Sequence, residues 1–196
     1  MADYQRPRSL RSSQSLEELE ERWSLTGNPV VEVHRAQPGV GLPAQLSATQ
    51  LATTLSDIHR STGVERAQTE FGLTGAGQTV VIIDSGIAYD HEALGGGLGS
   101  EFRVVGGWDF TEENDANPYD DGPAGFHGTH VAGILASSDE VHTGVAPGVD
   151  MVALRVFNDM GQGKLSWLES SLRWVVEHVN SFEHPITTVN LSIGTD

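Results

Sequence analysis

The chain has 196 residues, of which 38% are hydrophobic and 7% aromatic, and these values fit one globular domain with an attached arm rather than a disordered protein. Asp and Glu total 27 against 11 Lys and Arg, so a formal charge of −16 disfavours nucleic acid as a partner. The sequence has no cysteine, which excludes disulfides and thiolate chemistry, and no apolar run approaches the roughly 18 residues of a membrane span.

Residues 1–60 are expected to form an arm, partly disordered, that packs on the domain formed by residues 61–196. Residues 1–15 are polar and lack apolar periodicity, and residues 1–22 lack the apolar segment of a standard secretory signal. Pro and Gly at positions 38–43 interrupt any long element. One amphipathic helix is predicted from apolar residues at helical spacing, namely Leu46, Leu51, Leu55 and Ile58.

Three apolar runs rich in β-branched residues predict buried strands at residues 79–83, 151–157 and 186–193. Helical patterns separate these runs. Continuous apolar strands that alternate with helices are typical of a parallel sheet covered on both faces. The expected fold class is therefore α/β.

Two helices are predicted between the strands. The first extends from Gly128 to about Ser137, and the second extends over residues 165–179 with Ser166 and Glu169 as its capping box. The buried face of the second helix is expected to carry Leu168, Leu172, Val175, Val176 and Val179.

Asp84 and His127 are the candidate catalytic residues. Asp84 ends a predicted parallel strand, where open α/β sheets form their sites, although an Asp-Ser-Gly stretch is also typical of an ordinary turn. His127 precedes an apolar helix, whose partial positive charge at the N-terminus disfavours imidazolium. A neutral histidine can take a proton from a hydroxyl if a carboxylate holds its other N–H, and Asp84 is the candidate for that carboxylate.

His130 lies one turn into the same predicted helix, among Val131, Ile134 and Leu135, so we expect a core histidine bonded to backbone. A metal site on His127 and His130 is disfavoured, because helical metal ligands usually lie at i and i+4 with further donors nearby.

The stretches VVIIDSGI at residues 80–87 and HGTHVAGI at residues 127–134 resemble the aspartate and histidine motifs of the subtilisin-like serine proteases, or subtilases. The resemblance covers about residues 62–196. It includes three further stretches in the family's order, which are GVAP at residues 144–147, LRVF at 154–157 and VNLSIG at 189–194.

By this resemblance, Asp84 orients His127, which acts as general base toward a serine and then as general acid toward the leaving amine. Thr129 and His130 would hold the helix start. The family binds a polypeptide substrate as an added strand, and the resemblance implies a rail on each side of it. The implied substrate-binding residues are Gly161, Gly163 and Leu165 on one side, and Leu191, Ser192, Ile193 and Gly194 on the other.

The chain departs from the family pattern in two places. The Gly-Thr-Ser-Met-Ala-like motif that carries the nucleophile is absent, as is the oxyanion-hole asparagine, so we expect a fragment truncated after the substrate-binding strand and inactive alone. The missing C-terminal half is then a candidate partner. The family's calcium-binding turn is His91-Glu92-Ala93-Leu94 here, with Ala93 at the ligand position, so no metal and no cofactor are expected.

Two alternatives remain open. The acidic stretch formed by residues 112–115 with Asp120 and Asp121 is either a solvated loop or an attractor for basic residues of a peptide substrate. The whole chain is either half of a peptidase or a non-catalytic module that captures an extended peptide or a partner chain. The resemblance favours an extracellular or cell-surface location.

Overall fold

The computed structural model describes residues 31–32, 48–123 and 125–194, and side chains from residue 55 onward within these ranges. All of them belong to the unit Val31–Asp196. The expectations for residues 1–22 and 38–43 and for Leu46 lie outside the described residues, as does the side chain of Leu51. The boundary expected at residue 60 stays a prediction.

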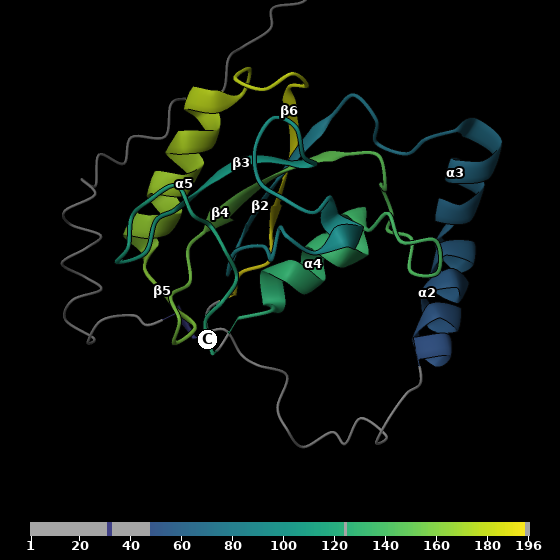
Figure 1. Ribbon diagram of the computed structural model, residues 1–196, viewed down its shortest axis with the longest axis horizontal. Helices are drawn as coiled ribbons and strands as arrows, with labels where there is room; N and C mark the ends of the chain where they lie inside the picture. Colours follow the sequence, from purple (N-terminus) through teal and green to yellow (C-terminus); the bar gives the residue numbers. More distant parts are fainter. Residues whose placement is uncertain (1–30, 33–47, 124, 195–196) are drawn as a thin grey trace, which may run out of the picture. The chain divides into compact units, whose positions relative to one another are not determined.

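A four-stranded parallel sheet forms the centre of the domain (Figure 1). Its spatial order is β3-β4-β2-β6. The first and last of these strands in the sequence, β2 and β6, are therefore neighbours in the sheet. The strands are β2 (Thr79–Asp84), β3 (Val104–Asp109), β4 (Asp150–Arg155) and β6 (Ile186–Leu191). The α/β class predicted from the apolar runs is confirmed.

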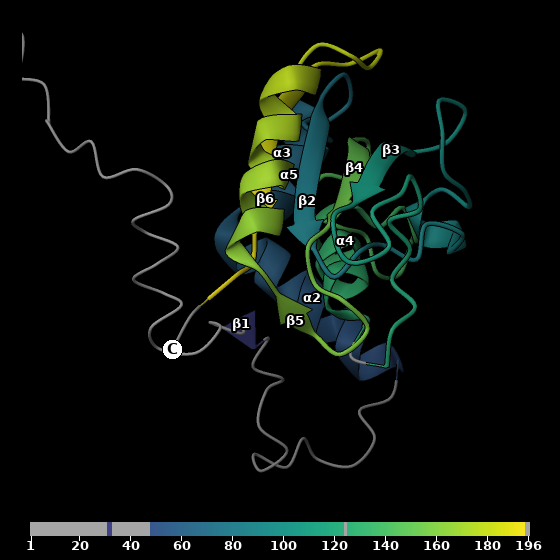
Figure 2. The same ribbon diagram turned by 90° about the vertical axis from the view of Figure 1, so that its left-hand side faces the viewer.

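One helix covers each face of the sheet, and Figure 2 views the strands with α5 (Leu165–His178) in front of them. α4 (His127–Ala136) packs over one face, and α5 packs over the other. Each residue of β2 is buried, and its side chains alternate between the two faces, as the period of a strand requires. Val80 and Ile82 therefore join the α4 side, while Val81 and Ile83 join the α5 side.

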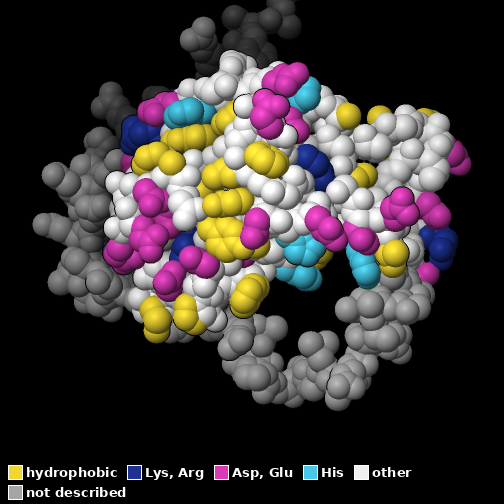
Figure 3. Space-filling view, viewed as in Figure 1, with side chains coloured by type: hydrophobic (Ala, Val, Ile, Leu, Met, Phe, Trp, Pro, Cys, Tyr) yellow, Lys and Arg dark blue, Asp and Glu magenta, His cyan; other side chains and the backbone are white. Residues whose placement is uncertain are grey.

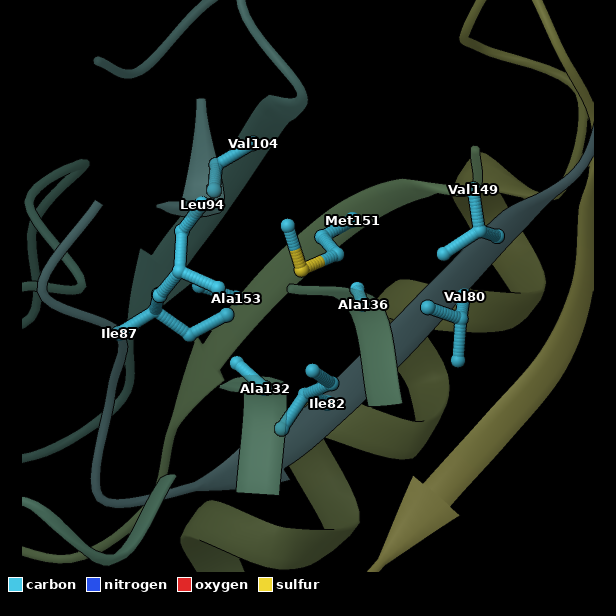
Figure 4. Close-up of a cluster of buried hydrophobic side chains, with 10 residues drawn as sticks. All are labelled: Val80, Ile82, Ile87, Leu94, Val104, Ala132, Ala136, Val149, Met151 and Ala153. Carbon is cyan, nitrogen blue, oxygen red and sulfur yellow. The ribbon is translucent and has the colours of Figure 1, made fainter. Parts of the chain in front are cut away.

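The core under α4 is built from small helix residues against larger strand residues (Figure 4). Gly128, Ala132 and Ala136 are buried and lie four residues apart on one face of α4. Their small side chains allow the helix to approach Ile82 and Met151 closely. The helix therefore begins close to the carboxyl end of β2.

The face of α5 that packs on the sheet agrees with the predicted one at Leu168 and Val175 but differs from it elsewhere. Trp167, Leu168, Trp174 and Val175 pack against the core, whereas the expected core residues Leu172, Val176 and Val179 are 42%, 75% and 39% exposed. The two tryptophans bury more apolar area than the leucine and valines would, and they rotate the helix accordingly.

The predicted capping box of α5 is also wrong. Lys164 is the N-cap residue and makes no side-chain cap hydrogen bond. Ser166 lies inside the helix, and Glu169 forms an ion pair with Arg173 instead, at 2.8 Å.

The remaining elements lie before and beside the sheet. The sheet strand β3, the helix α3 and the short strand β1 had no counterpart in the sequence prediction. α2 accounts for the predicted N-terminal helix, with Leu55 half-buried and Ile58 50% exposed. The bounds are β1 (Val31–Glu32), α2 (Ala48–Thr62), α3 (Val64–Phe71), η1 (Glu92–Leu94) and β5 (Gln162–Gly163).

Among the described helices, none combines the length and the apolarity that crossing a membrane requires.

Candidate active site

Asp84 and His127 meet above the carboxyl edge of the sheet. Asp84 is the last residue of β2 and is 1% exposed, and His127 is the first residue of α4 with its side chain 43% exposed. His127 Nδ1 lies 2.8 Å from Asp84 Oδ1. An ionised carboxylate can only accept, so the imidazole donates its Nδ1–H, and in the neutral form of the ring Nε2 then carries the lone pair.

Burial controls the electrostatics of Asp84. Oδ1 accepts from the Ser85 N–H at 2.7 Å as well as from His127, while the buried Oδ2 has no hydrogen-bond donor among the described residues. Loss of solvation raises the pKa of Asp84 above its ordinary value of 3.8, although the bonds from His127 and Ser85 oppose the rise. The carboxylate is thus costly to bury.

We expect the Asp84→Asn variant to be more stable than the parent protein at neutral pH, with a larger free energy of unfolding. A carboxyl whose pKa is raised by folding contributes stability that is complete below the unfolded value of 3.8 and is lost as the pH rises through the folded value. The advantage of the variant should therefore grow across that window and then level off. Urea unfolding of both proteins from about pH 3 to pH 8 measures it, and an advantage that is constant with pH would contradict the burial argument.

The start of α4 is held against the turn that follows Asp84. The Gly128 N–H donates to Ser85 Oγ at 2.9 Å, and Ser85 is only 6% exposed. A Cβ added to Gly128 would lie 2.2 Å from the Gly86 carbonyl oxygen and 3.0 Å from Asp84 Cβ. Only glycine permits this approach, and the approach places the next residue upstream, His127, beside Asp84.

The first predicted rail follows β4 and leaves the sheet at the same edge. Arg155 pairs in register with Asp84, and the chain then forms a hairpin in which Asn158 N–H donates to the Gln162 carbonyl at 3.0 Å. Gly161 turns this hairpin with φ 73°, and Gly163 lies in β5. Leu165, the third residue predicted for this rail, is the first residue of α5 and is 44% exposed.

The second predicted rail continues from β6. Leu191 pairs in register with Ile83, one residue before Asp84, and is 45% exposed. Ser192 and Gly194 are exposed, and Ser192 Oγ accepts from the Asn190 amide at 2.9 Å. Ile193 is half-buried against the core on the α5 side. The strand ends at Leu191, two residues earlier than the predicted end.

Comparisons with known proteins agree with this arrangement. The model of the subtilase family matches residues 75–196.

The chain belongs to the subtilase family.

Two curated relatives show the extent of the match. Subtilisin E of Bacillus subtilis (strain 168) is 34% identical over 125 residues, which are 63% of this chain and 28% of the relative. Serine protease AprX of the same strain is 32% identical over 151 residues, which are 74% of this chain and 31% of the relative. The chain thus spans about a third of the length of these relatives.

The fold agrees as well. The structure of the Clostridium perfringens CspB protease superimposes with a TM-score of 0.58 at 23% identity, over 69% of this chain and 33% of that one. The predicted subtilisin-like fold class and the resemblance to the subtilases are confirmed.

His130 of this subtilase is not the core histidine that the sequence predicted. It is exposed, because Gly128, Ala132 and Ala136 form the face of α4 that packs on the sheet, and residue 130 falls on the opposite side. Ile134, expected in the same core, is 45% exposed.

The acidic stretch before His127 is not uniformly solvated. Asp120 is 2% exposed and accepts from Thr129, whereas Glu112 and Asp121 are exposed and pair with Lys164 and Arg155. Acidic side chains recur over the face seen in Figure 3, with few basic ones among them. The sequence did not single out Asp120, because nothing in an acidic run distinguishes a buried member from its neighbours.

No group of three or more His, Asp or Glu side chains in the described part of the chain is placed to hold a metal ion. Ala93, which stands where the family's calcium ligand was expected, lies in the short helix η1. The expectation of no metal and no cofactor stays a prediction.

Proposed function

We propose that this chain supplies the Asp–His part of a serine endopeptidase active site. The observation that carries the proposal is the 2.8 Å contact between His127 Nδ1 and a carboxylate that is 99% buried, with the imidazole itself half-exposed. In this role Asp84 fixes the tautomer, so that Nε2 accepts the proton of a serine hydroxyl as the serine attacks a peptide carbonyl. The same nitrogen then returns the proton to the leaving amine.

We place the nucleophilic serine and the oxyanion donors outside these 196 residues. Ser85 is 6% exposed and its Oγ already accepts from the Gly128 N–H, so it cannot reach His127 Nε2 as a nucleophile. Ser192 accepts from Asn190 at the end of β6, away from any turn that opens a helix. The polypeptide that carries the missing half of the domain is the proposed partner, and the chain alone is expected to hydrolyse peptides poorly.

The proposed substrate is an extended polypeptide that lies between the two rails. Both rails leave the sheet at the carboxyl end of β2, because Arg155 and Leu191 are in register with Asp84 and Ile83. Within the β5 hairpin, the Gln162 carbonyl faces Asn158, and backbone groups alternate along a strand. The N–H and C=O of Gly163 therefore face away from the hairpin, where an added strand can pair with them.

A fluorophosphonate probe and a fluorogenic peptide test this proposal. Residues 1–196 alone should neither react with the probe nor turn over the peptide, whereas residues 1–196 joined to a serine-bearing subtilase segment should do both. Turnover by the joined protein that survives replacement of the segment's serine by alanine would contradict a serine mechanism.

One observation favours the second candidate, a peptide-binding module without catalysis. β1 pairs antiparallel with β5, with Val31 opposite Gly163 and Glu32 opposite Gln162. The edge of β5 thus accepts an extended segment as an added strand, and here the segment comes from the chain itself.

Replacing Val31 with proline should increase the affinity of the chain for an added extended peptide. Proline removes an N–H that faces Gly163, so the internal strand competes less well, and the loss of one backbone hydrogen bond corresponds to about fivefold in affinity. Glu32→Pro is the matched control, because its N–H points away from β5. Fluorescence anisotropy with a labelled peptide measures the affinity, and an equal effect of both variants would argue against competition at this edge.

A further inference from the structure

The first turn of α4, which carries His127, has no cap of the usual kind. Phe126 stands at the N-cap position with φ 77° and makes no side-chain cap hydrogen bond. The N–H groups of a first helical turn need partners from elsewhere. Because His127 is half-exposed and its side chain has only Asp84 as a hydrogen-bond partner among the described residues, the position of its imidazole depends on this turn.

Asp120, seven residues upstream, takes the place of the missing cap. Its Oδ2 accepts from the Thr129 N–H at 3.0 Å and from the Thr129 hydroxyl at 2.5 Å. The carboxylate is 2% exposed, and a negative charge beside a helix N-terminus is favourable. One buried carboxylate thus accepts from both hydrogen-bond donors of a residue two positions from His127.

Thr129 also connects this carboxylate to the turn after Asp84. Its Oγ accepts from the Ala88 N–H at 2.9 Å while its proton goes to Asp120. A second connection runs alongside, because the Ile87 N–H donates at 3.0 Å to the carbonyl of Pro118, two residues before Asp120. The segment that carries Asp84 and the helix that carries His127 are therefore joined through Thr129.

We propose that Asp120 is a positioning residue that acts through Thr129 to keep His127 at hydrogen-bonding distance from Asp84. The inference rests on the proposed function only for its catalytic consequence, because the geometry that it explains exists in the chain itself. Asp120 touches neither substrate nor reacting atoms in this role. Its effect is to fix the first turn of α4 relative to the end of β2.

The alternative is that Asp120 and Thr129 only stabilise the fold. Thr79 separates the two roles, since it is the same residue type, is fully buried, and lies at the opposite end of β2 from Asp84. Its hydroxyl donates to the His184 carbonyl at 2.8 Å. Thr79→Val therefore removes a buried threonine hydroxyl bond without touching the start of α4.

The test is the His127 Nδ1–H signal in NMR spectra of the chain labelled with ¹⁵N at histidine. In Thr129→Val we expect this proton to exchange with water at least about tenfold faster, as loss of one charge-assisted hydrogen bond would allow. Thr129→Ser, which keeps the hydroxyl, should restore the parent rate. Thr79→Val should keep the parent rate even where its unfolding free energy falls as much as that of Thr129→Val.

Asp120→Asn gives the same comparison with less disturbance to folding, because the amide keeps one acceptor oxygen for Thr129. It should also accelerate the exchange. Folded Asp120→Asn or Thr129→Val protein with the parent exchange rate would overturn the proposal. Absence of the Nδ1–H signal from the parent protein would instead count against the Asp84–His127 pair, and thus against the proposed function.

Discussion

Replacing His127 with alanine is expected to lower kcat/KM for peptide hydrolysis by on the order of 10⁴-fold or more, in the protein that joins residues 1–196 to the serine-bearing half. Without the imidazole, no group accepts the serine proton as the hydroxyl attacks. Asp84 cannot substitute, because it is 1% exposed and lies behind the ring. Initial rates with a fluorogenic peptide measure the loss.

His130→Ala is the matched control for this experiment. His130 lies three residues later on the same helix and is exposed, so its loss leaves the site intact. We expect its kcat/KM to stay within about twofold of the parent value, as for a surface substitution. Equal losses in the two variants would show that the effect comes from the helix and not from the imidazole of His127.

Arg155→Met should lower the unfolding free energy by about 3–5 kcal/mol, which is the usual consequence of removing one partner from a buried ion pair. The Arg155 side chain is 4% exposed, and its Nε lies 3.4 Å from Oδ2 of Asp109, whose side chain is fully buried. That oxygen has no hydrogen-bond donor among the described residues, while Oδ1 accepts from the Thr111 N–H at 2.6 Å, so Arg155 supplies the positive charge beside this carboxylate. Chemical denaturation measures the change.

The same arginine connects the segments around the site. It donates to the Tyr119 carbonyl at 2.9 Å, to Asp121 at 3.0 Å and to Asp159. These residues lie before His127 and within the β5 hairpin, so a loss of Arg155 also frees the first rail.

Two further variants test this interpretation. Arg173→Met removes an exposed arginine that pairs with Glu169 at 2.8 Å, and it should cost less than about 1 kcal/mol. Adding Asp109→Asn to Arg155→Met should recover part of the loss, because the uncompensated charge is then gone. If the double variant is no more stable than Arg155→Met, the loss does not arise from Asp109.

The sequence predicted the parts of the fold in which burial decides the structure. The runs that became β2 and β4 are apolar between their end residues and are buried, as strands covered on both faces must be. β6 also carries Thr187, Thr188 and Asn190 and is largely exposed, so the burial predicted for this strand is wrong. β3 escaped prediction because it contains Gly106 and Gly107, and a Cβ at Gly107 would lie 2.2 Å from the Ala153 carbonyl oxygen. The close approach of the β4 backbone requires glycine at Gly107, and the composition of a segment does not predict such an approach.

The packing of α5 shows a second limit. Its sequence offers two apolar stripes, and the structure buries the one that contains Trp167 and Trp174. Spacing alone gives no reason to prefer it over the stripe with Leu172 and Val176, since both follow a helical period. The larger apolar area of the two tryptophans favours the stripe that contains them.

At the candidate site, the sequence pointed to the two residues that the structure brings into contact, Asp84 and His127. The residues that hold them could not be found in this way. Ser85, Thr129 and Asp120 act through hydrogen bonds to backbone groups or to one another. These contacts join the turn after Asp84, the loop that contains Asp120 and the start of α4. Sequence spacing does not predict how these three segments pack together.

The most direct test of the central claim is the tautomer of His127 in the ¹⁵N-histidine spectrum of the folded chain at neutral pH. The account predicts a proton on Nδ1, held by Asp84, and an unprotonated Nε2 that is free to act as a base. Asp84→Asn should abolish this preference. A parent protein with its proton on Nε2, or a tautomer unchanged by Asp84→Asn, would contradict the account.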